Sequence, residues 1–425
     1  MTEPLPPTAD TAMGCMPPTT ETPAVVISST ILPPSPVVLR LMAGRSKRLR
    51  AGHPWIYSNE IHMTPEVKAL PGGTLVQLED AGGEKLGTGS FNAHSLIAFR
   101  LFDRDVSQEI TVGWVTQRLE RALALRDLLF PRPFYRLIHS EADGLPGLII
   151  DRYGDVFTLQ ANTAGMDRLT PLVLEALEGL FHPRAIVLRN DSPARGLEGL
   201  EQGYSIARGT LDGPVELEEN GVRFLADLTE GQKTGWFYDQ RDNRAAAAQL
   251  AAGRRVIDFY TYAGGFALQA AQAGARETIA VDRSEGSLAL ARQAAALNAL
   301  TVECRRAEAF GEMERLAKAG EKFGLVIADP PAFVKSKKDL ASGLKGYRKM
   351  AKLAANLVEP GGFLLLGSCS HHVSAEAFAE ETAQGLAGAG RTGRILRAAG
   401  AGADHPVHPQ LPESAYLKAL LFQLD

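Results

Sequence analysis

The chain has 425 residues, of which 45% are hydrophobic and 22% charged, so it has the length and composition of a globular protein with two or three domains. A net charge of −4 excludes a surface coated with basic side chains, although a local basic patch would still be sufficient to bind nucleic acid. The sequence contains no run of about 18 apolar residues, which a membrane-spanning helix would need, so we expect no contact with a membrane.

Three cysteines, Cys15, Cys304 and Cys369, are too few and too scattered for a disulfide framework or a zinc site. They favour a reducing compartment, and the N-terminus carries no charged region followed by an apolar stretch, which argues against a secretory signal. A cytoplasmic location is therefore expected. His371 and His372 have no third ligand at a recognisable spacing, so no metal site is predicted.

The sequence of residues 1–225 predicts a tail followed by two domains. Residues 1–36 are rich in proline and threonine and have little to bury, which is typical of a disordered tail. Short apolar runs separated by glycine and proline turns predict a small β-rich domain over residues 37–106. Two long helical stretches and three strands follow, so residues 107–225 are expected to form a central α+β domain.

Residues 226–425 predict an α/β domain. From about residue 254, seven expected strands alternate with helices, apart from two late strands that close the domain. This order is typical of βαβ units and predicts a mostly parallel, seven-stranded, Rossmann-like sheet. Ligands of such sheets bind at the carboxyl ends of the strands, so chemistry is expected directly after each strand.

The first three strand ends predict a nucleoside-binding site. Asp258 and Tyr260 lead into a loop with Gly264 and Gly265, but the G-x-G-x-x-G spacing of a dinucleotide fold is absent. This favours a cofactor with an α-amino group, although the glycines could equally form only a helix-entry turn. Asp282 ends the next strand, where it could bind ribose hydroxyls or cap a helix. Glu308 follows the third strand, and we expect it near an adenine.

The fourth and fifth strand ends carry the expected catalytic residues. Asp329 precedes Pro330 and Pro331, which stiffen the loop and leave its carbonyls free to hold the polar edge of a base, unless the loop is only a rigid turn. Cys369 lies among serines and histidines after the fifth strand. A thiolate that adds to C6 of a cytosine makes C5 nucleophilic enough to accept a methyl group. The alternative is that Cys369 is a small buried apolar residue.

Several motifs together resemble the class I ribosomal RNA large-subunit methyltransferases that depend on S-adenosylmethionine (SAM). They are Phe224–Asp227, Gly231–Arg241, the Asp258 loop, Asp329–Pro331, Ser368–Ser370, Ser140–Leu148 and Ala403–Pro406. Within that family the chain is most similar to the members that make 5-methylcytosine in 23S rRNA. The resemblance covers residues 37–425.

The resemblance implies an N-terminal PUA domain, a central α+β domain and a Rossmann-like methyltransferase domain. It also implies Cys369 as the nucleophile and a set of contacts to SAM, namely Phe237, Gln240, Arg241, Asp258, Tyr260, Asp282, Glu308 and Asp329. Members are often homodimers, so a homodimer is a further expectation. Ala332 follows Pro331 where relatives often carry Lys or Ser, so that side chain offers no contact to the base.

A basic run near the start of the β-rich domain predicts contact with RNA. Phosphate-binding cations beside an aromatic side chain are typical of RNA-binding surfaces, although a short charged run is often only a solvated face. The expected RNA-binding residues are Arg45, Lys47, Arg48, Arg50 and Trp55, joined by Lys335 after the Asp329 loop.

The leading prediction is therefore an RNA cytosine-C5 methyltransferase that acts on 23S ribosomal RNA or on an assembly intermediate of the large subunit. Two alternatives stay open. One is transfer to a guanine or adenine nitrogen, with Asp329 and the proline carbonyls holding the base. The other is a non-catalytic RNA-binding or ribosome-assembly factor that keeps a degenerate methyltransferase domain.

Overall fold

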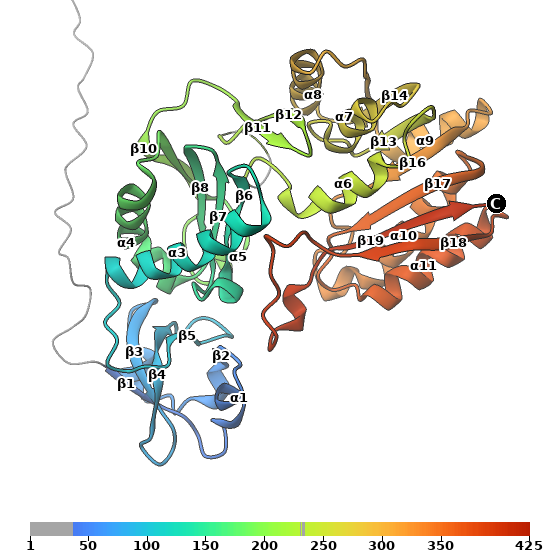
Figure 1. The fold of residues 1–425 in the computed structure, drawn as a ribbon. Coiled ribbons are helices and arrows are strands. Elements are labelled where there is room, and N and C mark those ends of the chain that lie inside the picture. The colour runs from blue at the N-terminus through green and yellow to red at the C-terminus, as the bar shows by residue number, and fades with distance from the viewer. Residues whose placement is uncertain (1–36, 230, 232–233) are drawn as a thin grey trace, which may run out of the picture.

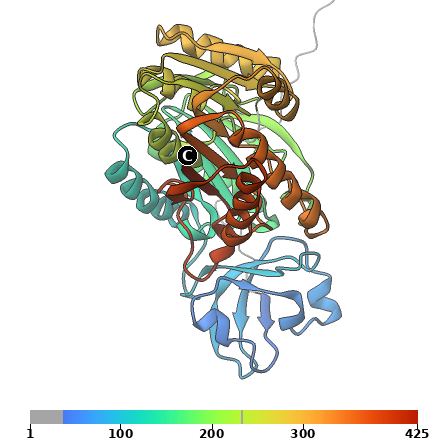
Figure 2. The same cartoon turned by 90° about the vertical axis from the view of Figure 1, so that its right-hand side faces the viewer.

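The computed structural model describes residues 37–229, 231 and 234–425, which fold into three units in chain order (Figures 1 and 2). The predicted tail, residues 1–36, lies outside the described residues. The C-terminal unit contains the sheet that positions the site, and the other two units follow one another along the chain before it (Figure 1).

The N-terminal unit is a five-stranded sheet in the order β1-β3-β4-β5-β2, with β1 parallel to β3 and the other pairs antiparallel. Its interior is filled by buried side chains such as Leu39, Leu78, Phe91 and Phe99. Its elements are β1 (Val37–Arg40), α1 (Lys47–Arg50), β2 (Trp55–Ile56), η1 (Ser58–Glu60), α2 (Pro65–Lys68), β3 (Thr74–Glu79), β4 (Lys85–Phe91) and β5 (Phe99–Asp103).

The central unit is a second five-stranded sheet in the order β10-β9-β8-β7-β6. Its two long helices, α3 and α4, pack against each other and on the sheet, and Thr111 and Thr163 cap their N-termini. The elements are α3 (Val112–Leu129), β6 (Phe134–His139), η2 (Ser140–Asp143), β7 (Leu148–Tyr153), β8 (Val156–Ala161), α4 (Ala164–Phe181), β9 (Ala185–Asn190), α5 (Ala194–Leu197) and β10 (Gly203–Gly209).

A hairpin of β11 (Val215–Glu219) and β12 (Val222–Ala226) connects the central and C-terminal units. Its apolar face packs on α8 (Glu285–Leu297), so its buried residues share a core with that helix. The predicted domain boundary at residue 226 thus falls at the end of a hairpin that packs on the C-terminal unit.

The C-terminal unit confirms the predicted Rossmann-like fold. Its seven-stranded sheet has the order β15-β14-β13-β16-β17-β19-β18, and only the pairs that involve β19 are antiparallel. The strands are β13 (Arg255–Phe259), β14 (Glu277–Asp282), β15 (Glu303–Arg306), β16 (Phe323–Ala328), β17 (Val358–Ser368), β18 (Gly393–Ala399) and β19 (Lys418–Leu424). The strand order reverses between β13 and β16, and such a reversal leaves a crevice for ligands at the carboxyl ends.

Helices follow most of these strands and cover both faces of the sheet. They are η3 (Tyr238–Gln240), α6 (Arg241–Ala248), α7 (Gly265–Gln272), α8, α9 (Ala309–Lys318), η4 (Lys337–Asp339), α10 (Leu340–Ala355), α11 (Ala375–Gly388) and η5 (Pro412–Ser414). The main core lies between the sheet and the helices α9, α10 and α11, where Phe323, Tyr347 and Phe378 are buried.

The C-terminal segment, residues 400–417, leaves the sheet between β18 and β19 and reaches the central unit (Figure 1). There the Asp404 carboxylate accepts the backbone N–H of Arg136 at 3.0 Å, and the Arg126 guanidinium donates to the carbonyl of Asp404 at 3.1 Å. These bonds bring a segment from the end of the chain against strand β6, which starts near residue 134.

Candidate active site

A cavity of about 950 Å³ opens at the carboxyl ends of β13, β14, β16 and β17. Its walls come from the loops after these strands, from the segment that enters η3, from strand β6 and from the C-terminal segment. Six of the nine residues expected to bind the cofactor line it, namely Phe237, Gln240, Tyr260, Asp282, Glu308 and Asp329, and so does Cys369.

The loop after β13 forms the floor of the cavity. Tyr260, Tyr262 and Gly264 have φ values of 63°, 54° and 84°, a left-handed conformation that is costly for the two tyrosines. Asp258 is buried beneath this loop, where its Oδ2 accepts hydrogen bonds from the Thr261 hydroxyl and from the backbone N–H of Ala267. Asp258 and Gly264 thus hold the loop without lining the cavity.

The Asp258 carboxyl has a raised pKa. Burial, with a smaller contribution from the nearby Asp329, raises its pKa to about 7 against the opposing effect of the hydrogen bonds from Thr261 and Ala267. Its Oδ1 is buried without a hydrogen-bond partner among the described residues. A carboxylate in this position would be stabilised by a positive charge placed above the loop.

Asp282 and Glu308 line the cavity at the next two strand ends. Asp282 accepts the backbone N–H of Tyr262 on Oδ2 at 3.0 Å and that of Ser284 on Oδ1 at 2.9 Å. The N-cap of α8 is Ser284, so the alternative that Asp282 caps this helix is wrong. Glu308 does cap a helix, because its carboxylate accepts the N–H of Gly311 at 2.8 Å at the start of α9.

The segment around η3 faces Asp329. Gln240 donates from Nε2 to Asp329 Oδ2 at 2.7 Å, and the Phe237 ring lies edge-on to the Tyr262 ring with centroids 5.3 Å apart. Arg241 does not line the cavity. Its guanidinium lies 4.7 Å from the centroid of the Phe130 ring and 3.9 Å from the Asp404 carboxylate, so it connects α6 to the other units.

Cys369 is half-buried at the end of β17, beside the Asp329 loop. A Cβ atom on Gly367 would lie 2.1 Å from Asp329 Oδ1, so only glycine leaves room for the carboxylate at this position. The flanking Ser368 and Ser370 are fully buried and bond to the hydroxyl of Tyr347 at 2.9 and 2.8 Å. Cys369 is therefore not the buried apolar residue of the alternative interpretation.

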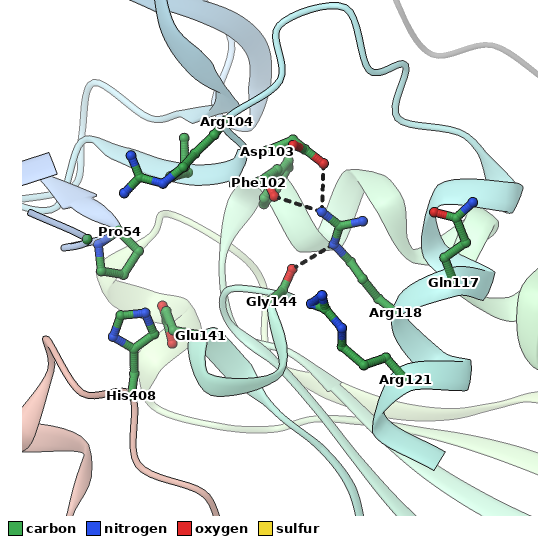
Figure 3. A pocket seen from close by; sticks show the side chains of 12 residues that line it. Pro54, Phe102, Asp103, Arg104, Gln117, Arg118, Arg121, Glu141, Gly144 and His408 are labelled. Atoms are coloured by element: carbon green, nitrogen blue, oxygen red, sulfur yellow. Dashed lines mark hydrogen bonds and ion pairs between the residues drawn. The ribbon is translucent and has the colours of Figure 1, made fainter. Parts of the chain in front are cut away.

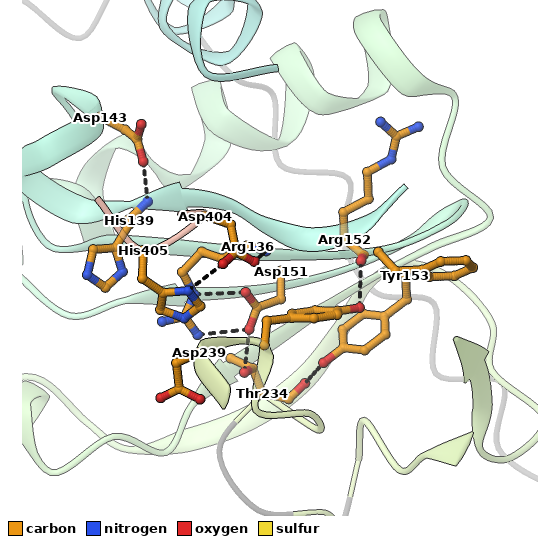
Figure 4. Close-up of polar contacts among 12 residues, drawn as sticks. Arg136, His139, Asp143, Asp151, Arg152, Tyr153, Thr234, Asp239, Asp404 and His405 are labelled. Atoms are coloured by element: carbon orange, nitrogen blue, oxygen red, sulfur yellow. Dashed lines mark hydrogen bonds and ion pairs between the residues drawn. The ribbon is translucent and has the colours of Figure 1, made fainter. Parts of the chain in front are cut away.

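The second wall of the cavity was not predicted from the sequence. It consists of Arg136 and His139 from β6, Asp239 from η3, and His405 and Tyr416 from the C-terminal segment. Figure 4 shows Arg136, His139, Asp239 and His405. These residues are far apart in the chain, and no spacing between them indicates a site. The only hint was the stretch Ala403–Pro406 among the motifs that carry the family resemblance.

Cys304 is half-buried in β15, and burial raises the pKa of its thiol, which fits a structural role. Within residues 37–229, 231 and 234–425, no group of three or more His, Cys, Asp or Glu side chains could hold a metal ion. No helix in the described part of the chain is both long and apolar enough to cross a membrane.

The cations expected to bind RNA differ in whether they form ion pairs within the chain. Arg45, Lys47 and Lys335 are exposed. Arg50, in contrast, forms ion pairs with Asp80 and Glu84 at 2.9 and 2.7 Å.

The other two residues expected to bind RNA, Arg48 and Trp55, also have partners within the chain. Arg48 pairs with Glu60 at 2.9 Å, and the Trp55 indole N–H donates to Glu141 at 2.9 Å. The basic run therefore supports the fold of the N-terminal unit as well as presenting charge to solvent.

A second cavity of about 580 Å³ lies where the N-terminal unit, α3 and the C-terminal segment meet (Figure 3). Arg104, Arg121 and His408 line it, one from each of these parts. Arg118 also lines it, but its guanidinium is held by Asp103 at 2.8 Å and lies over the Trp114 ring. Arg121 is exposed and has no ion pair among the described residues.

Comparison with known proteins explains the architecture. The family of S-adenosylmethionine-dependent methyltransferases matches residues 207–423, and the PUA-like domain matches residues 39–104. The ribosomal RNA large subunit methyltransferase I of Aeromonas salmonicida (strain A449) is 36% identical over 393 residues, covering 91% of this chain and 98% of that protein. The chain belongs to the ribosomal RNA large subunit methyltransferase I family.

Another relative supports this assignment, and two solved structures share the fold. The family member from Cronobacter sakazakii is 36% identical over 90% of this chain and 98% of its own length. A structure from Streptococcus mutans, described as a SAM-dependent methyltransferase, has a TM-score of 0.75, with 20% identity and coverage of 91% and 100% of the two chains. A methyltransferase structure complexed with S-adenosylhomocysteine has a TM-score of 0.77 at 20% identity, with the same coverage.

The protein of this family is thus a SAM-dependent methyltransferase, and the first cavity has the features that SAM requires. Carboxylates at successive strand ends suit its ammonium and ribose hydroxyl groups, and the rings of Tyr260, Phe310 and Phe333 give apolar surface for an adenine. The buried, unpartnered oxygen of Asp258 adds negative charge beneath the same loop.

Proposed function

We propose that the protein methylates C5 of a cytosine in large-subunit (23S) ribosomal RNA, with Cys369 as the covalent nucleophile. The relatives are named as methyltransferases of this RNA. The observation that carries the choice of base is the position of Cys369, a half-buried thiol that lines the same cavity as Tyr260, Asp282 and Asp329. Transfer to a purine nitrogen would need no thiol at this point.

The chemistry requires a thiolate because C5 of a cytosine is a weak nucleophile. The Cys369 sulfur adds to C6, and the electron pair of the C5=C6 bond becomes available at C5. SAM supplies an electrophilic methyl group. C5 takes this group, loses its proton, and the C5=C6 double bond forms again as the C6–S bond breaks. The products are 5-methylcytosine and the free thiolate.

The loops around Cys369 are suited to hold a base in place. Pro330 and Pro331 stiffen the Asp329 loop, and Val334 donates its backbone N–H to the Ser370 hydroxyl at 3.2 Å. The Tyr347 hydroxyl bonds to the serines on both sides of Cys369. This network fixes the Cys369 loop against the Asp329 loop, so both keep one geometry when a flipped base enters.

Two groups of cations are proposed to bind the RNA backbone. Arg45 and Lys47 are exposed on the N-terminal unit, and Lys335 is exposed after the Asp329 loop. Arg104 and Arg121 line the cavity between the units and add positive charge on the side of the PUA-like domain. With ribosomal RNA as the substrate, the proposed location of the protein is the cytoplasm, where a free thiol also stays reduced.

The decisive experiment compares ribosomal RNA from cells with and without the protein. Bisulfite sequencing and nucleoside mass spectrometry are expected to show a 5-methylcytosine that disappears with the protein and is not restored by Cys369→Ala. The Ala variant should still bind SAM in calorimetry. A methylated purine nitrogen in place of 5-methylcytosine would contradict the proposed base, and full turnover by Cys369→Ala would contradict the mechanism.

A trapping experiment tests the covalent step directly. RNA with 5-fluorocytosine at the target should form an adduct with the wild-type protein that survives denaturation, since fluorine cannot leave as a proton does. The adduct should be absent with Cys369→Ala. Absence of SAM binding by the wild-type protein would instead indicate a non-catalytic RNA-binding factor.

A further inference from the structure

We propose that His405, oriented by the carboxylate of Asp404, is the base that removes the C5 proton from the methylated cytosine. This inference rests on the proposed function, since only a C5 methyl transfer needs such a base. It assigns a second catalytic residue beside Cys369, from a segment some forty residues further along the chain.

Asp404 and His405 form a buried dyad. The Nδ1 atom of His405 lies 2.9 Å from Asp404 Oδ1, and Asp404 Oδ2 accepts the backbone N–H of Arg136 at 3.0 Å. The carboxylate therefore holds the proton on Nδ1 and leaves Nε2 as the acceptor. Asp404 is fully buried and His405 is only 4% exposed, yet His405 lines the active-site cavity. Its Nε2 has no hydrogen-bond partner among the described residues.

The dyad is joined to the Cys369 loop by a short chain of contacts. His405 donates its backbone N–H to the carbonyl of Gly402 at 2.9 Å, and Gly402 donates to the carbonyl of Asp239 at 3.0 Å. The Asp239 carboxylate accepts the Tyr416 hydroxyl at 2.6 Å.

From Tyr416 the contacts continue to the nucleophile. The Tyr416 ring lies 5.1 Å from the ring of His371, two residues after Cys369. Lys418 donates from Nζ to the carbonyls of both Ser370 and Tyr416, at 2.6 and 2.8 Å. The base and the nucleophile are therefore connected through bonded segments that line the same cavity.

The charges around the dyad favour a proton acceptor. Burial would raise the pKa of the Asp404 carboxyl, but His405, Arg241 and the N–H of Arg136 together lower it to about 2, so it stays ionised. The ring of His139 lies 5.0 Å from that of His405. Burial and the nearby Arg136 lower the pKa of His139 to about 2, so this neighbour is neutral and does not oppose a positive charge on His405.

The other acids and bases of the cavity are less suited to the step. One oxygen of Asp329 accepts the amide of Gln240, and the other lies against Gly367. Asp239 already accepts the Tyr416 hydroxyl on Oδ2 at 2.6 Å, so this oxygen is engaged in a hydrogen bond. His371 is exposed to solvent.

The proposed step conserves atoms and charge. After methyl transfer, C5 carries both the methyl group and its original hydrogen, and C6 carries the sulfur. Nε2 of His405 takes the C5 proton, and the electron pair of the C5–H bond forms the C5=C6 double bond. The electron pair of the C6–S bond leaves with Cys369 as a thiolate. The imidazolium, paired with Asp404, then returns its proton to water.

The test uses His405→Gln in the full-length protein with ordinary ribosomal RNA and SAM. Because methyl transfer precedes the proton step, this variant should accumulate a protein–RNA adduct that survives denaturation and carries the transferred methyl group. Release of 5-methylcytosine should fall by about 100-fold or more, the scale of general-base catalysis. SAM binding in calorimetry should be unchanged, and Cys369→Ala in the same background should abolish the adduct.

Controls separate this role from a structural one. His372→Gln alters an exposed histidine of the Cys369 loop outside the cavity and should release product normally. His405→Asn should stall as His405→Gln does, which guards against a folding defect in one variant. Asp404→Asn alters a positioning residue, so it should stall in part and displace the pH profile of product release.

Three results would overturn the inference. They are normal product release by His405→Gln, loss of activity without an adduct, and an adduct that accumulates with His371→Gln instead. The proposed function fails differently, through the absence of a 5-fluorocytosine adduct with the wild-type protein. The two claims can therefore be judged separately.

Discussion

The two halves of the active-site cavity are built in different ways. The cofactor half is built at the ends of three strands that succeed one another along the chain, where Asp282 and Glu308 line the cavity and Asp258 lies buried beneath it. The substrate half combines Cys369 with groups from strand β6, η3 and the C-terminal segment. The first half needs only the βα order of one unit, whereas the second exists only when two units are packed together. This contrast predicts different consequences for substitutions in each half.

The largest effect is expected where the halves meet, at Gly367. Its replacement by alanine would place a Cβ 2.1 Å from Asp329 Oδ1, so the carboxylate must leave its bond to Gln240. Because a displacement of about 1 Å at a reacting centre can cost 100-fold, Gly367→Ala should lower kcat/KM by about 100-fold. Steady-state kinetics on ribosomal RNA measures this. Wild-type kinetics in a folded variant would show that the two halves are independent.

The cofactor half should respond to pH through Asp258. Its pKa is raised to about 7, so the carboxyl takes up a proton as the pH falls below 7 and loses the charge that favours an ammonium group. SAM affinity should fall by up to about tenfold per pH unit below 7, since one pKa unit corresponds to a tenfold change. Calorimetry from pH 8 to pH 6 measures the effect.

The matched variant Asp258→Asn should bind SAM weakly and with little dependence on pH. In the cofactor-free protein, Asp258 should affect folding stability in the opposite direction, with stability falling as the pH rises. The raised pKa contributes stability that is present below the unfolded value of about 3.8 and is lost as the pH rises through 7. Asp258→Asn should remove that loss, and an unchanged pH dependence would show that another group carries it.

The substrate half should respond to acid through His139. Its pKa is lowered from 6.5 to about 2 by burial and by Arg136, so the unfolded chain binds a proton that the folded protein excludes. The stability from this group is present above pH 6.5 and is lost as the pH falls, by up to about 1.4 kcal/mol per pH unit. Urea unfolding at pH 7, 6 and 5 should show a shallower decline for His139→Gln. Parallel curves would assign the acid sensitivity elsewhere.

The smallest effects are expected outside both halves, in RNA docking. Arg121 is exposed without an ion pair among the described residues, so Arg121→Ala should weaken RNA binding and lower the slope of log K against log salt by about 1. Arg50 already pairs with Asp80 and Glu84, so Arg50→Ala should change that slope less. Filter binding at several salt concentrations compares them. A larger loss of RNA affinity with Arg50→Ala would indicate that the basic run at residues 45–50 is the main RNA-binding site.

The contrast also explains how far sequence reasoning could go. The places of Asp282, Asp329 and Cys369 followed from a local rule, because a parallel sheet collects the residues after its strands at one edge. The dyad of Asp404 and His405 followed no such rule, since its partner strand β6 begins about 270 residues earlier.

Sequence by itself determined the three-unit order, the parallel sheet and the strand-end residues, because hydrophobic periodicity and turn residues act over short distances. Tertiary structure alone decided which charges are free and which are paired, as the partners of Arg48 and Arg50 show. It also decided which side chains face Cys369. These outcomes depend on packing between distant segments, and burial and neighbouring charges, not residue type, then set the protonation of groups such as Asp258 and His139.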